Sequence, residues 1–547
     1  MLPRLTLPPP PAALAVLAAA FILPGLVFHD LWKTQDAIGL GIVHGMAVSG
    51  DLVVPSVGGV PWLQDQPLYH WVALLFGKLF GWAIEFHAAA RLASGAFVAA
   101  AFVFIYSAER EWTVDDPDVR RTAAGAAFLV LMGCAGLLVH AHEALPELAS
   151  LAALCAALTA LPYATRRPVL AGMAFGVALG VAFLSASWTA PAGLALAVIA
   201  AHLAVPEWRT RSGATFLVIS LVLALLIASA WPLALALRSG DLFLDWWDIA
   251  AQRDGRFGEN VRHFFSTASW FTWPAWPLAL WSAWSLRRRW RELRLFVPGA
   301  AVLAMAALHI VWGPPQDENL IPLLAPLSLL AAHGVFTLRR GAVAALDWFG
   351  VLTFAVFTAL VWLGYIAMLT GLPAPMARNF ARIAPGFVAQ LQPLAVVAAV
   401  LLIVVWSYLI FFTPYSPMRS VARWACGMVL LWGTFAMLWM PWVDYQKSYR
   451  PVALQLKAKI PPKSACIAQR GLGVSQAAAL DYHGGIRTQP FDAAKPAACP
   501  LVLVQGAPQA EREPQASTAR PVQWAKLADV GRPGDRAERY RLYRLKR

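Results

Sequence analysis

The segment GATFLVISLVLALLIASAWPLALA, residues 213–236, carries no charged side chain and lies between Arg211 and Arg238. As a helix rising about 1.5 Å per residue, it is long enough to cross a hydrocarbon core of about 30 Å. Similar apolar runs recur along the 547-residue chain, which is 59% hydrophobic and only 14% charged. Soluble domains carry about 25% charged residues. The sequence therefore predicts an all-α polytopic membrane protein.

Apolar runs of this kind predict about thirteen membrane-spanning helices. The first run lacks a small-residue cleavage site and is followed by Pro24 and His29, so a retained helix is expected rather than a signal peptide. The predicted spans cover residues 11–28, 88–107, 122–139, 147–163, 168–184, 189–205, 213–236, 267–286, 296–312, 319–337, 343–369, 394–412 and 424–443.

The basic residues indicate how these helices are oriented. Because basic loops favour the cytoplasm, arginines in alternate connections predict a cytoplasmic N-terminus and a periplasmic C-terminal part in a bacterial inner membrane. The net charge of +14 then reflects topology, and no nucleic-acid partner is expected. The arginines are Arg110, Arg120, Arg121, Arg166, Arg167, Arg209, Arg211, Arg287, Arg288, Arg289, Arg291, Arg294, Arg339, Arg340, Arg419 and Arg423.

The same pattern divides the chain into a transmembrane domain, 1–443, and a small periplasmic α/β domain, 444–547. The first outward loop, 29–87, is long, and helices along the membrane interface are expected at Asp36–Ser49 and Pro67–Trp82. Long ordered outward loops commonly carry functional sites, because they can hold polar groups that the spans cannot. Two further long outward loops are predicted at 238–266 and 370–393.

The C-terminal part alternates strand-like runs with segments rich in Pro, Gly and Ala. Cys466 and Cys499 fall here, in an oxidising compartment, so a disulfide between them is predicted. The strand-like runs are Ser464–Gln469, Pro500–Gln505 and Arg539–Leu545, with a loose linker at Gly506–Arg520, while Cys134, Cys155 and Cys426 lie in spans.

Acidic residues recur at the outer ends of the predicted helices. Two carboxylates that reach one cavity from different loops can act as a base, bind a metal or stabilise a developing cation. A solvated loop position is the alternative for any one of them. These acids are Asp36, Asp51, Asp65, Glu143, Glu147, Asp317 and Glu318.

Two further groups are candidates for binding. His140, His142 and Glu143 form an H-x-H-E cluster in which His142 and Glu143 could bind a divalent metal, although neighbours in sequence rarely converge on one ion without other ligands. Arg91, at the outer end of the second span, could bind a phosphate or simply extend its guanidinium to the membrane–water interface. Further phosphate candidates are Arg253, Arg256, Arg262 and His263.

The run QDAIGLGIVHGMAVSGDLVVPSVGGVPWLQDQPLYHW, residues 35–71, resembles the first outward loop of the C-type glycosyltransferases, the superfamily of aminoarabinose transferases and protein O-mannosyltransferases. The shared features are Met46, Ser49-Gly50-Asp51, Pro55 and Pro67-Leu68-Tyr69-His70-Trp71. The resemblance continues through FGWAIEFHAAARLASG, 80–95, ALPELASL, 144–151, GVALGVAFLSASWTAP, 176–191, and NLIPLLAPLSLLAA, 319–332. It covers nearly all of the predicted membrane region.

The resemblance implies a sugar transferase that uses a polyprenyl-phosphate sugar at the periplasmic face. The acceptor would be an envelope molecule such as lipid A, a glycan or a protein. Asp36 would be the catalytic carboxylate, with Glu147 orienting the acceptor or holding a metal. The substrate-binding residues would be Gln35, Asp65, Tyr69, Arg91, Arg256, Arg262 and His263.

This chain departs from the family pattern at its charged positions. The usual Asp-Glu pair is Gln35-Asp36, and three expected cations are replaced by Ile38, Asp65 and Ala186. A lipid phosphate without close cations in a low-dielectric setting costs several kcal/mol unless other residues or a metal replace them. Lys33, Arg91, Arg256 and Arg262 are the candidate replacements.

The missing cations leave a second hypothesis open. A non-catalytic descendant of the family would bind a lipid-linked glycan or a partner protein through its outward surface. A transporter is a weaker third alternative, because the predicted spans carry no obvious acids or bases at mid-membrane.

Overall fold

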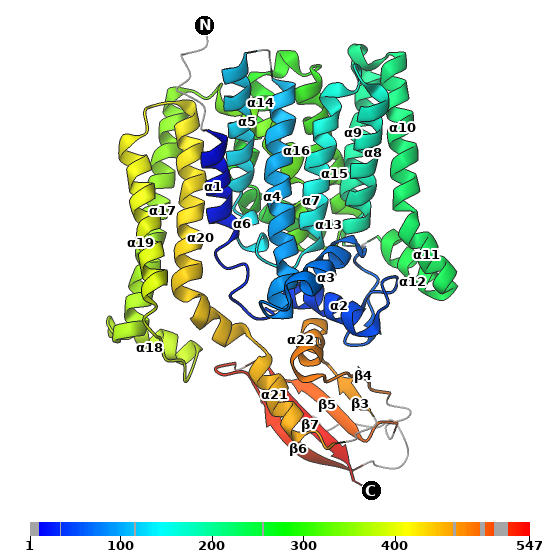
Figure 1. The fold of residues 1–547 in the computed structure, drawn as a ribbon, viewed down its shortest axis with the longest axis vertical. Helices are drawn as coiled ribbons and strands as arrows, with labels where there is room; N and C mark the ends of the chain where they lie inside the picture. The colour runs from blue at the N-terminus through cyan, green and yellow to red at the C-terminus, as the bar shows by residue number, and fades with distance from the viewer. Residues whose placement is uncertain are drawn as a thin grey trace.

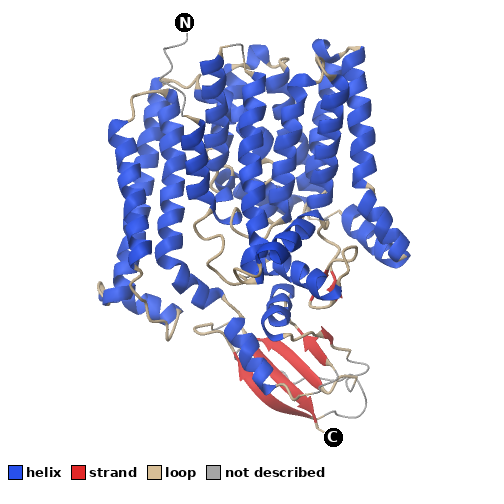
Figure 2. Ribbon diagram, in the orientation of Figure 1, coloured by secondary structure: helices blue, strands red, loops and turns tan. Residues whose placement is uncertain are grey.

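The structure, a computed structural model, consists of a helical bundle with a small mixed domain at one end (Figures 1 and 2). It describes residues 10–32, 34–113, 116–253, 256–462, 466–492, 498–507, 523–535 and 537–546. Figure 2 shows helices throughout the bundle, while the larger sheet belongs to the C-terminal part. The predicted fold class, an α-helical membrane protein with a small C-terminal α/β domain, is confirmed.

The long helices of the bundle follow the apolar runs. Their bounds are α1 (Pro11–Ile22), α4 (Phe86–Trp112), α5 (Pro117–Met132), α7 (Pro146–Ala160), α8 (Pro168–Ser185), α9 (Thr189–Ala204), α10 (Arg211–Ala228), α14 (Ala275–Ser285), α15 (Leu293–Trp312), α16 (Leu324–Val335), α17 (Arg340–Thr370), α19 (Pro393–Phe412) and α20 (Pro417–Lys447). The other helices of this region are α6 (Leu137–His140), α11 (Ala230–Arg238), α12 (Gly240–Ala251), α13 (Phe257–Phe271) and α18 (Ala374–Ile383).

Within the described residues, eight helices are long and apolar enough to cross a membrane, and four more apolar helices are shorter. The count of about thirteen spans therefore stays a prediction. The first helix is shorter than its predicted span because α1 ends at Ile22, before Pro24 and Gly25. Gly25 adopts a φ of 80°, a left-handed conformation that favours glycine, and its backbone packs on Trp432.

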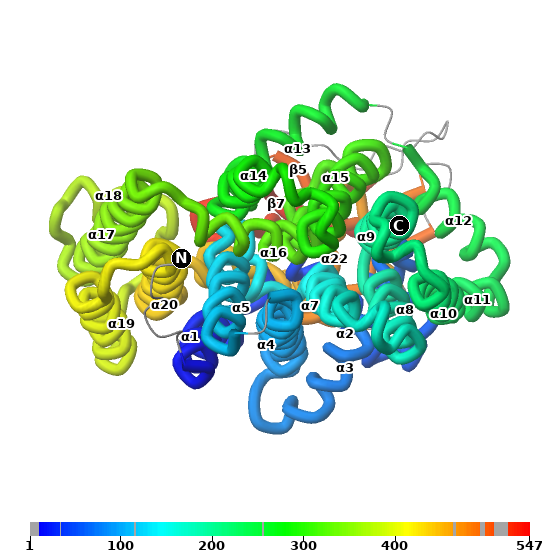
Figure 3. The backbone as a smooth tube through the Cα atoms, turned by 90° about the horizontal axis from the view of Figure 1, so that it is seen from above, coloured from blue at the N-terminus to red at the C-terminus, as the bar shows by residue number. Residues whose placement is uncertain are grey.

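The arginine-rich connections lie at the end of the bundle away from the mixed domain (Figure 1). Examples are the connection from α4 to α5 and that from α19 to α20. Figure 3 shows α17, α18 and α19 at one edge of the bundle and α10, α11 and α12 at the opposite edge. One end of the bundle is therefore basic, as the predicted orientation requires. Which side of the membrane this end faces stays a prediction.

The first outward loop contains the two helices expected there, α2 (Gln35–Ser49) and α3 (Leu68–Phe80). Between them lies a small antiparallel hairpin of β1 (Ser56–Val57) and β2 (Val60–Pro61). Apolar residues of α2 and α3, including Leu40, Val43 and Leu74, form one buried cluster under the bundle. This packing holds the start of α2 against the end of the bundle.

The mixed domain contains a five-stranded sheet of order β4-β3-β5-β7-β6. β3, β4 and β5 are parallel to one another, whereas β7 runs antiparallel to β5 and β6. One face of the sheet packs on two helices through Leu456, Leu480 and Leu503. The elements are β3 (Ile467–Arg470), β4 (Gln489–Pro490), β5 (Leu501–Gly506), β6 (Trp524–Val530), β7 (Arg539–Leu545), α21 (Arg450–Lys459) and α22 (Val474–Gly484). Most of the predicted linker, 508–520, lies outside the described residues.

The mixed domain docks on the first outward loop through α22, which packs directly on α2, so that a Cβ at Gly41 would lie 2.6 Å from the Cβ of Ala478. Polar contacts surround this packing. His483 Nε2 lies 2.9 Å from Asp30 Oδ1, and Ser448 Oγ donates to Asp30 Oδ2 at 2.6 Å. The domain therefore braces the segment that leads into α2.

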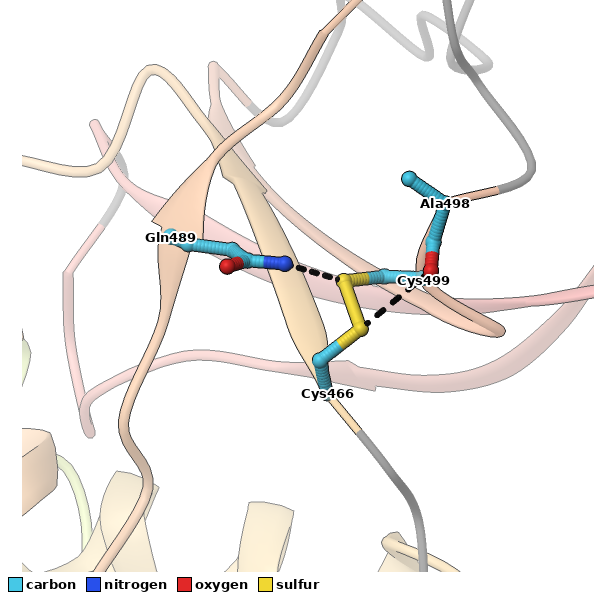
Figure 4. Close-up of a disulfide and its surroundings, with 4 residues drawn as sticks. All are labelled: Cys466, Gln489, Ala498 and Cys499. Atoms are coloured by element: carbon cyan, nitrogen blue, oxygen red, sulfur yellow. Dashed lines mark hydrogen bonds between the residues drawn. A yellow bond between two sulfur atoms is a disulfide. The ribbon is translucent and has the colours of Figure 1, made fainter.

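A disulfide joins Cys466 and Cys499, the pair predicted from the sequence (Figure 4). The two cysteines precede β3 and β5, which pair in parallel with Ile467 opposite Leu501. The bond therefore ties together the beginnings of two neighbouring strands. Gln489 Nε2 lies 2.7 Å from Cys499 Sγ, which connects β4 to the same point.

Replacing both cysteines, Cys466→Ser with Cys499→Ser, is expected to destabilise the mixed domain by about 3–4 kcal/mol, because the crosslink closes a loop with a sequence separation of 33. Limited proteolysis of the full chain, with and without reductant, measures this. Reductant should increase cleavage of the wild type and have no added effect on the double variant. Equal cleavage of both proteins without reductant would contradict the prediction.

Candidate active site

Asp36, on the first turn of α2, is fully buried and faces Arg91 of α4. Arg91 donates from Nε to Asp36 Oδ1 at 3.1 Å and from Nη2 to Oδ2 at 2.9 Å. The backbone N–H of Ala144 donates to Oδ1 at 2.9 Å and that of Trp32 to Oδ2 at 3.1 Å. Each oxygen of this carboxylate therefore accepts two hydrogen bonds from the protein.

These contacts argue against the catalytic role predicted for Asp36. Burial, the largest single effect, would raise the pKa of this carboxyl, but the charges of Arg91 and His29 and the hydrogen bonds from Arg91 and Trp32 together lower the pKa. A carboxylate held ionised, with both oxygens occupied, is a poor proton acceptor. Asp36 instead joins the start of α2 to α4 and to the segment before α7, where Gly39 allows close approach to the Ala144 carbonyl.

Arg91 is equally occupied, and its contacts argue against the predicted role in binding a phosphate. Its side chain has no exposed surface. Besides Asp36, it donates to the carbonyl oxygens of His29 and Asp30, both at 3.1 Å. A guanidinium with these partners holds the first outward loop against α4.

Tyr69, predicted to bind substrate, is also fully buried. Its hydroxyl lies 2.7 Å from Ser94 Oγ, and Ser94 donates in turn to the Glu143 carbonyl at 2.7 Å. Tyr69 therefore joins α3 to α4 within the protein.

The sequence-predicted residues that do meet are Gln35, Asp65 and Glu147. They line one pocket next to Asp36, and Glu318 joins them from the 3-10 turn η4 (Asp317–Leu320). Four separate segments thus contribute to one site: the start of α2, the loop before α3, the first turn of α7 and η4. The lining residues are Gln35, Ile38, Gly39, Trp62, Gln64, Asp65, Leu145, Pro146, Glu147, Gln316 and Glu318.

Three carboxylates meet here without a cation among the described lining residues. Glu147 is 7% exposed and Glu318 is 8% exposed, and each has one carboxylate oxygen that is buried without a hydrogen-bond partner in the part of the chain that the structure describes. Burial raises the pKa of Glu318. Buried acids with unused oxygens are costly for stability and are typical of binding or catalytic sites.

The cavity itself is small, about 20 Å³, which is roughly the space for one water molecule. A ligand larger than water would therefore contact the three carboxylates from the mouth of the pocket. Trp62 lines this pocket and donates from Nε1 to Asp65 Oδ2 at 2.8 Å. The indole thus orients the Asp65 carboxylate.

Asp65→Asn is expected to raise the unfolding temperature at pH 7.5 and to raise it much less at pH 4. Burial raises the pKa of Asp65 to about 6, opposed by the Trp62 hydrogen bond and aided by nearby Glu318. An unfolded Asp titrates near pH 4, so the folded state holds the extra proton between about pH 4 and 6, and stability falls as the pH rises through that window. Thermal unfolding in detergent measures this. Asp245→Asn, at an exposed position on α12, is the control, and an equal gain at both pH values would contradict the assignment.

The predicted metal site at His142 and Glu143 does not assemble. His142 Nδ1 lies 2.9 Å from the Leu138 carbonyl oxygen and Nε2 lies 2.8 Å from that of Phe21, so its ring faces the bundle. Glu143 contacts His140 instead, at 2.9 Å. Among the described residues, no three His, Cys, Asp or Glu side chains are grouped so that they could hold a metal ion.

The remaining basic candidates do not line the pocket. His263 Nε2 is 3.5 Å from Asp317 Oδ1 in η4, the turn that contributes Glu318 to the pocket. Arg256 lies immediately before α13, where it is exposed and pairs with Glu259. Arg262 lies in the second turn of α13 and is also exposed. Arg253 stacks over Trp312, 4.8 Å from the ring centroid. Lys33 lies outside the described residues.

Glu318 is one of the outward acids of the sequence, but the sequence does not assign it to the site. It is 253 residues beyond Asp65 in the chain, and local sequence patterns do not report such proximity. Its only sequence signal is its place at the outer end of a predicted span.

No protein-family model matches the chain. It is 24% identical over 449 residues to the undecaprenyl phosphate-alpha-4-amino-4-deoxy-L-arabinose arabinosyl transferase of Pseudomonas savastanoi pv. phaseolicola, covering 78% of this chain and 77% of that protein. It is 26% identical over 372 residues to the transferase of the same name from Aeromonas salmonicida, covering 64% of this chain and 65% of that protein.

A crystal structure similar to this one is that of ArnT from Cupriavidus metallidurans bound to undecaprenyl phosphate. The TM-score is 0.69 at 17% identity, and the match covers 96% of each chain. The same protein in the apo state gives a TM-score of 0.67. The chain therefore has the fold of ArnT from Cupriavidus metallidurans and resembles aminoarabinose transferases in sequence, as its motifs predict.

Proposed function

We propose that this chain is a membrane glycosyltransferase that moves a sugar from a polyprenyl-phosphate donor to an envelope acceptor. The observation that carries the proposal is the pocket in which Asp65, Glu147 and Glu318 meet. It lies between the first outward loop and the bundle, in a fold shared with a protein whose structure contains undecaprenyl phosphate. The positive-inside pattern supports a periplasmic location for the pocket, on the inner membrane.

In the proposed reaction, an acceptor oxygen attacks the anomeric carbon of the donor sugar. The bond from that carbon to the phosphate oxygen breaks, and polyprenyl phosphate leaves with the electron pair. If the acceptor is a hydroxyl, its proton passes to a carboxylate of the pocket. Glu147 is the group best suited to this role, because it has a buried oxygen without a hydrogen-bond partner in the described structure.

The three carboxylates also favour a substrate that bears an amine. A protonated amine at the mouth would supply the positive charge that the described lining residues lack, and charge-assisted hydrogen bonds would orient it. The names of the similar transferases specify a 4-amino sugar. We therefore propose an amino sugar as the transferred group, with lipid A, a glycan or a protein as the acceptor.

The donor phosphate still needs positive partners. Arg256 and Arg262 are the described candidates, because α13 carries Arg262 and packs against the turn that holds Glu318. Without such partners, the absence of lining cations among the described residues would favour the alternative function, a non-catalytic protein that binds a lipid-linked glycan.

Reconstituted full-length protein supplied with undecaprenyl-phosphate 4-amino-4-deoxy-arabinose and lipid A tests the proposal. We expect the release of undecaprenyl phosphate and the appearance of a modified acceptor by mass spectrometry, and slower turnover with the corresponding neutral pentose donor. Binding of undecaprenyl phosphate without turnover of either donor would overturn the proposal and support the non-catalytic alternative.

A further inference from the structure

A wide apolar groove runs along the outside of the bundle between α1, α5, α19 and α20. Its volume is about 810 Å³. Half of the residues of α19 are exposed, and only Ala399 and Trp406 of that helix are buried. The groove includes the start of α20, which lies at the end of the bundle opposite the mixed domain (Figure 1). It is therefore separate from the candidate active site.

Two arginines line one end of this groove. Arg419 Nη2 and Arg423 Nη1 each donate to the same oxygen, Asp347 Oδ2, at 2.8 Å. Arg423 is only 7% exposed. The Nε groups of both arginines are buried without hydrogen-bond partners in the part of the chain that the structure describes.

The charges at this end do not balance. Two guanidinium groups share one carboxylate, and no further acid is among the described residues that line the groove. One net positive charge is therefore left at the end of an apolar surface. A desolvated cation of this kind is stabilised by an anion that can reach it, and guanidinium groups bind phosphate particularly well.

The depth of the groove matches one leaflet of a bilayer. Its lining positions on α20 run from Met418 to Leu430, a helical rise of about 18 Å. That is somewhat more than half of a hydrocarbon core of about 30 Å. The groove thus suits an acyl chain that begins at the arginines, whereas a long polyprenyl chain would extend well beyond it.

A second groove on the bundle serves as a contrast. It lies between α1, α3 and α4, has a volume of about 610 Å³ and is lined by no charged side chain among the described residues. Any lipid chain could fill that groove without headgroup selection. Only a groove that ends on unbalanced arginines can select for headgroup charge.

We propose that the groove between α1, α5, α19 and α20 binds an anionic glycerophospholipid. Its phosphate contacts Arg419 and Arg423, and its acyl chain lies along α19 and α20. Basic pockets between membrane helices on the cytoplasmic side commonly bind anionic headgroups, and the predicted orientation places this end of the bundle there. The lipid would fasten α19, half of whose residues are exposed, to α20.

Native mass spectrometry of the full-length protein, incubated with equal amounts of phosphatidylglycerol and phosphatidylethanolamine, tests the proposal. The wild type is expected to retain phosphatidylglycerol preferentially. Arg419→Gln leaves the Arg423–Asp347 ion pair and makes the site neutral, so retention should fall about tenfold. Asp347→Asn adds one net positive charge, and retention should rise.

Arg287→Gln is the matched control, because Arg287 lies in another basic connection, stacks on Trp284 and does not line the groove. It should retain phosphatidylglycerol as the wild type does. The proposal is overturned if the wild type shows no headgroup preference or if Arg419→Gln retains as much phosphatidylglycerol as Arg287→Gln. Displacement of phosphatidylglycerol by an equal concentration of undecaprenyl phosphate would also overturn it.

Discussion

Arg91→Met is expected to destabilise the protein by about 3–5 kcal/mol, because it leaves the Asp36 carboxylate buried without its ion-pair partner. The carbonyl oxygens of His29 and Asp30 would lose donors at the same time. Thermal unfolding in detergent measures the effect. Because Arg91 connects α4 to the loop that carries α2, cleavage by a protease in residues 29–67 should increase in parallel.

A matched control for Arg91→Met is Arg120→Met, which breaks the partly exposed pair with Glu111. We expect less than about 1 kcal/mol there. The double variant Arg91→Met with Asp36→Asn should lose less stability than the two single variants lose together, since no buried charge is left unpaired. If Arg91→Met proved as mild as Arg120→Met, the structural role of the pair would be wrong.

Glu147→Gln is expected to lower sugar transfer at least about 100-fold while leaving stability unchanged or slightly raised. The carboxylate lines the pocket and is 7% exposed, with one oxygen unpartnered in the described structure. An amide of the same shape removes the proton-accepting carboxyl group without creating a cavity. A loss of activity in a protein that is at least as stable as the wild type separates a catalytic role from a structural one.

The measurement for Glu147→Gln is turnover of the polyprenyl-phosphate donor alongside thermal unfolding. Glu143→Gln is the control, because Glu143 is close in sequence but pairs with His140 and does not line the pocket. Its turnover should stay within a few-fold of the wild type. If Glu147→Gln kept more than half of the wild-type turnover, Glu147 would have no catalytic role.

Asp36 and Glu147 illustrate the limits of reading a site from local motifs. Both are acids on the first turn of a helix, and the resemblance assigns both of them to the site. Only their neighbours distinguish them. Asp36 meets a guanidinium that is 55 residues away in sequence, whereas Glu147 meets two other carboxylates.

The sequence by itself determined the fold class and the helices of the first outward loop, and it predicted the pairing of Cys466 with Cys499 found in the structure. These features depend on hydrophobicity, on chain length relative to a bilayer and on local helix signals, all of which a single segment carries. The site depended on tertiary structure, because burial and charge pairing arise only when distant segments meet. Only the tertiary packing pairs Asp36 with Arg91 and brings Glu318 next to Asp65 and Glu147.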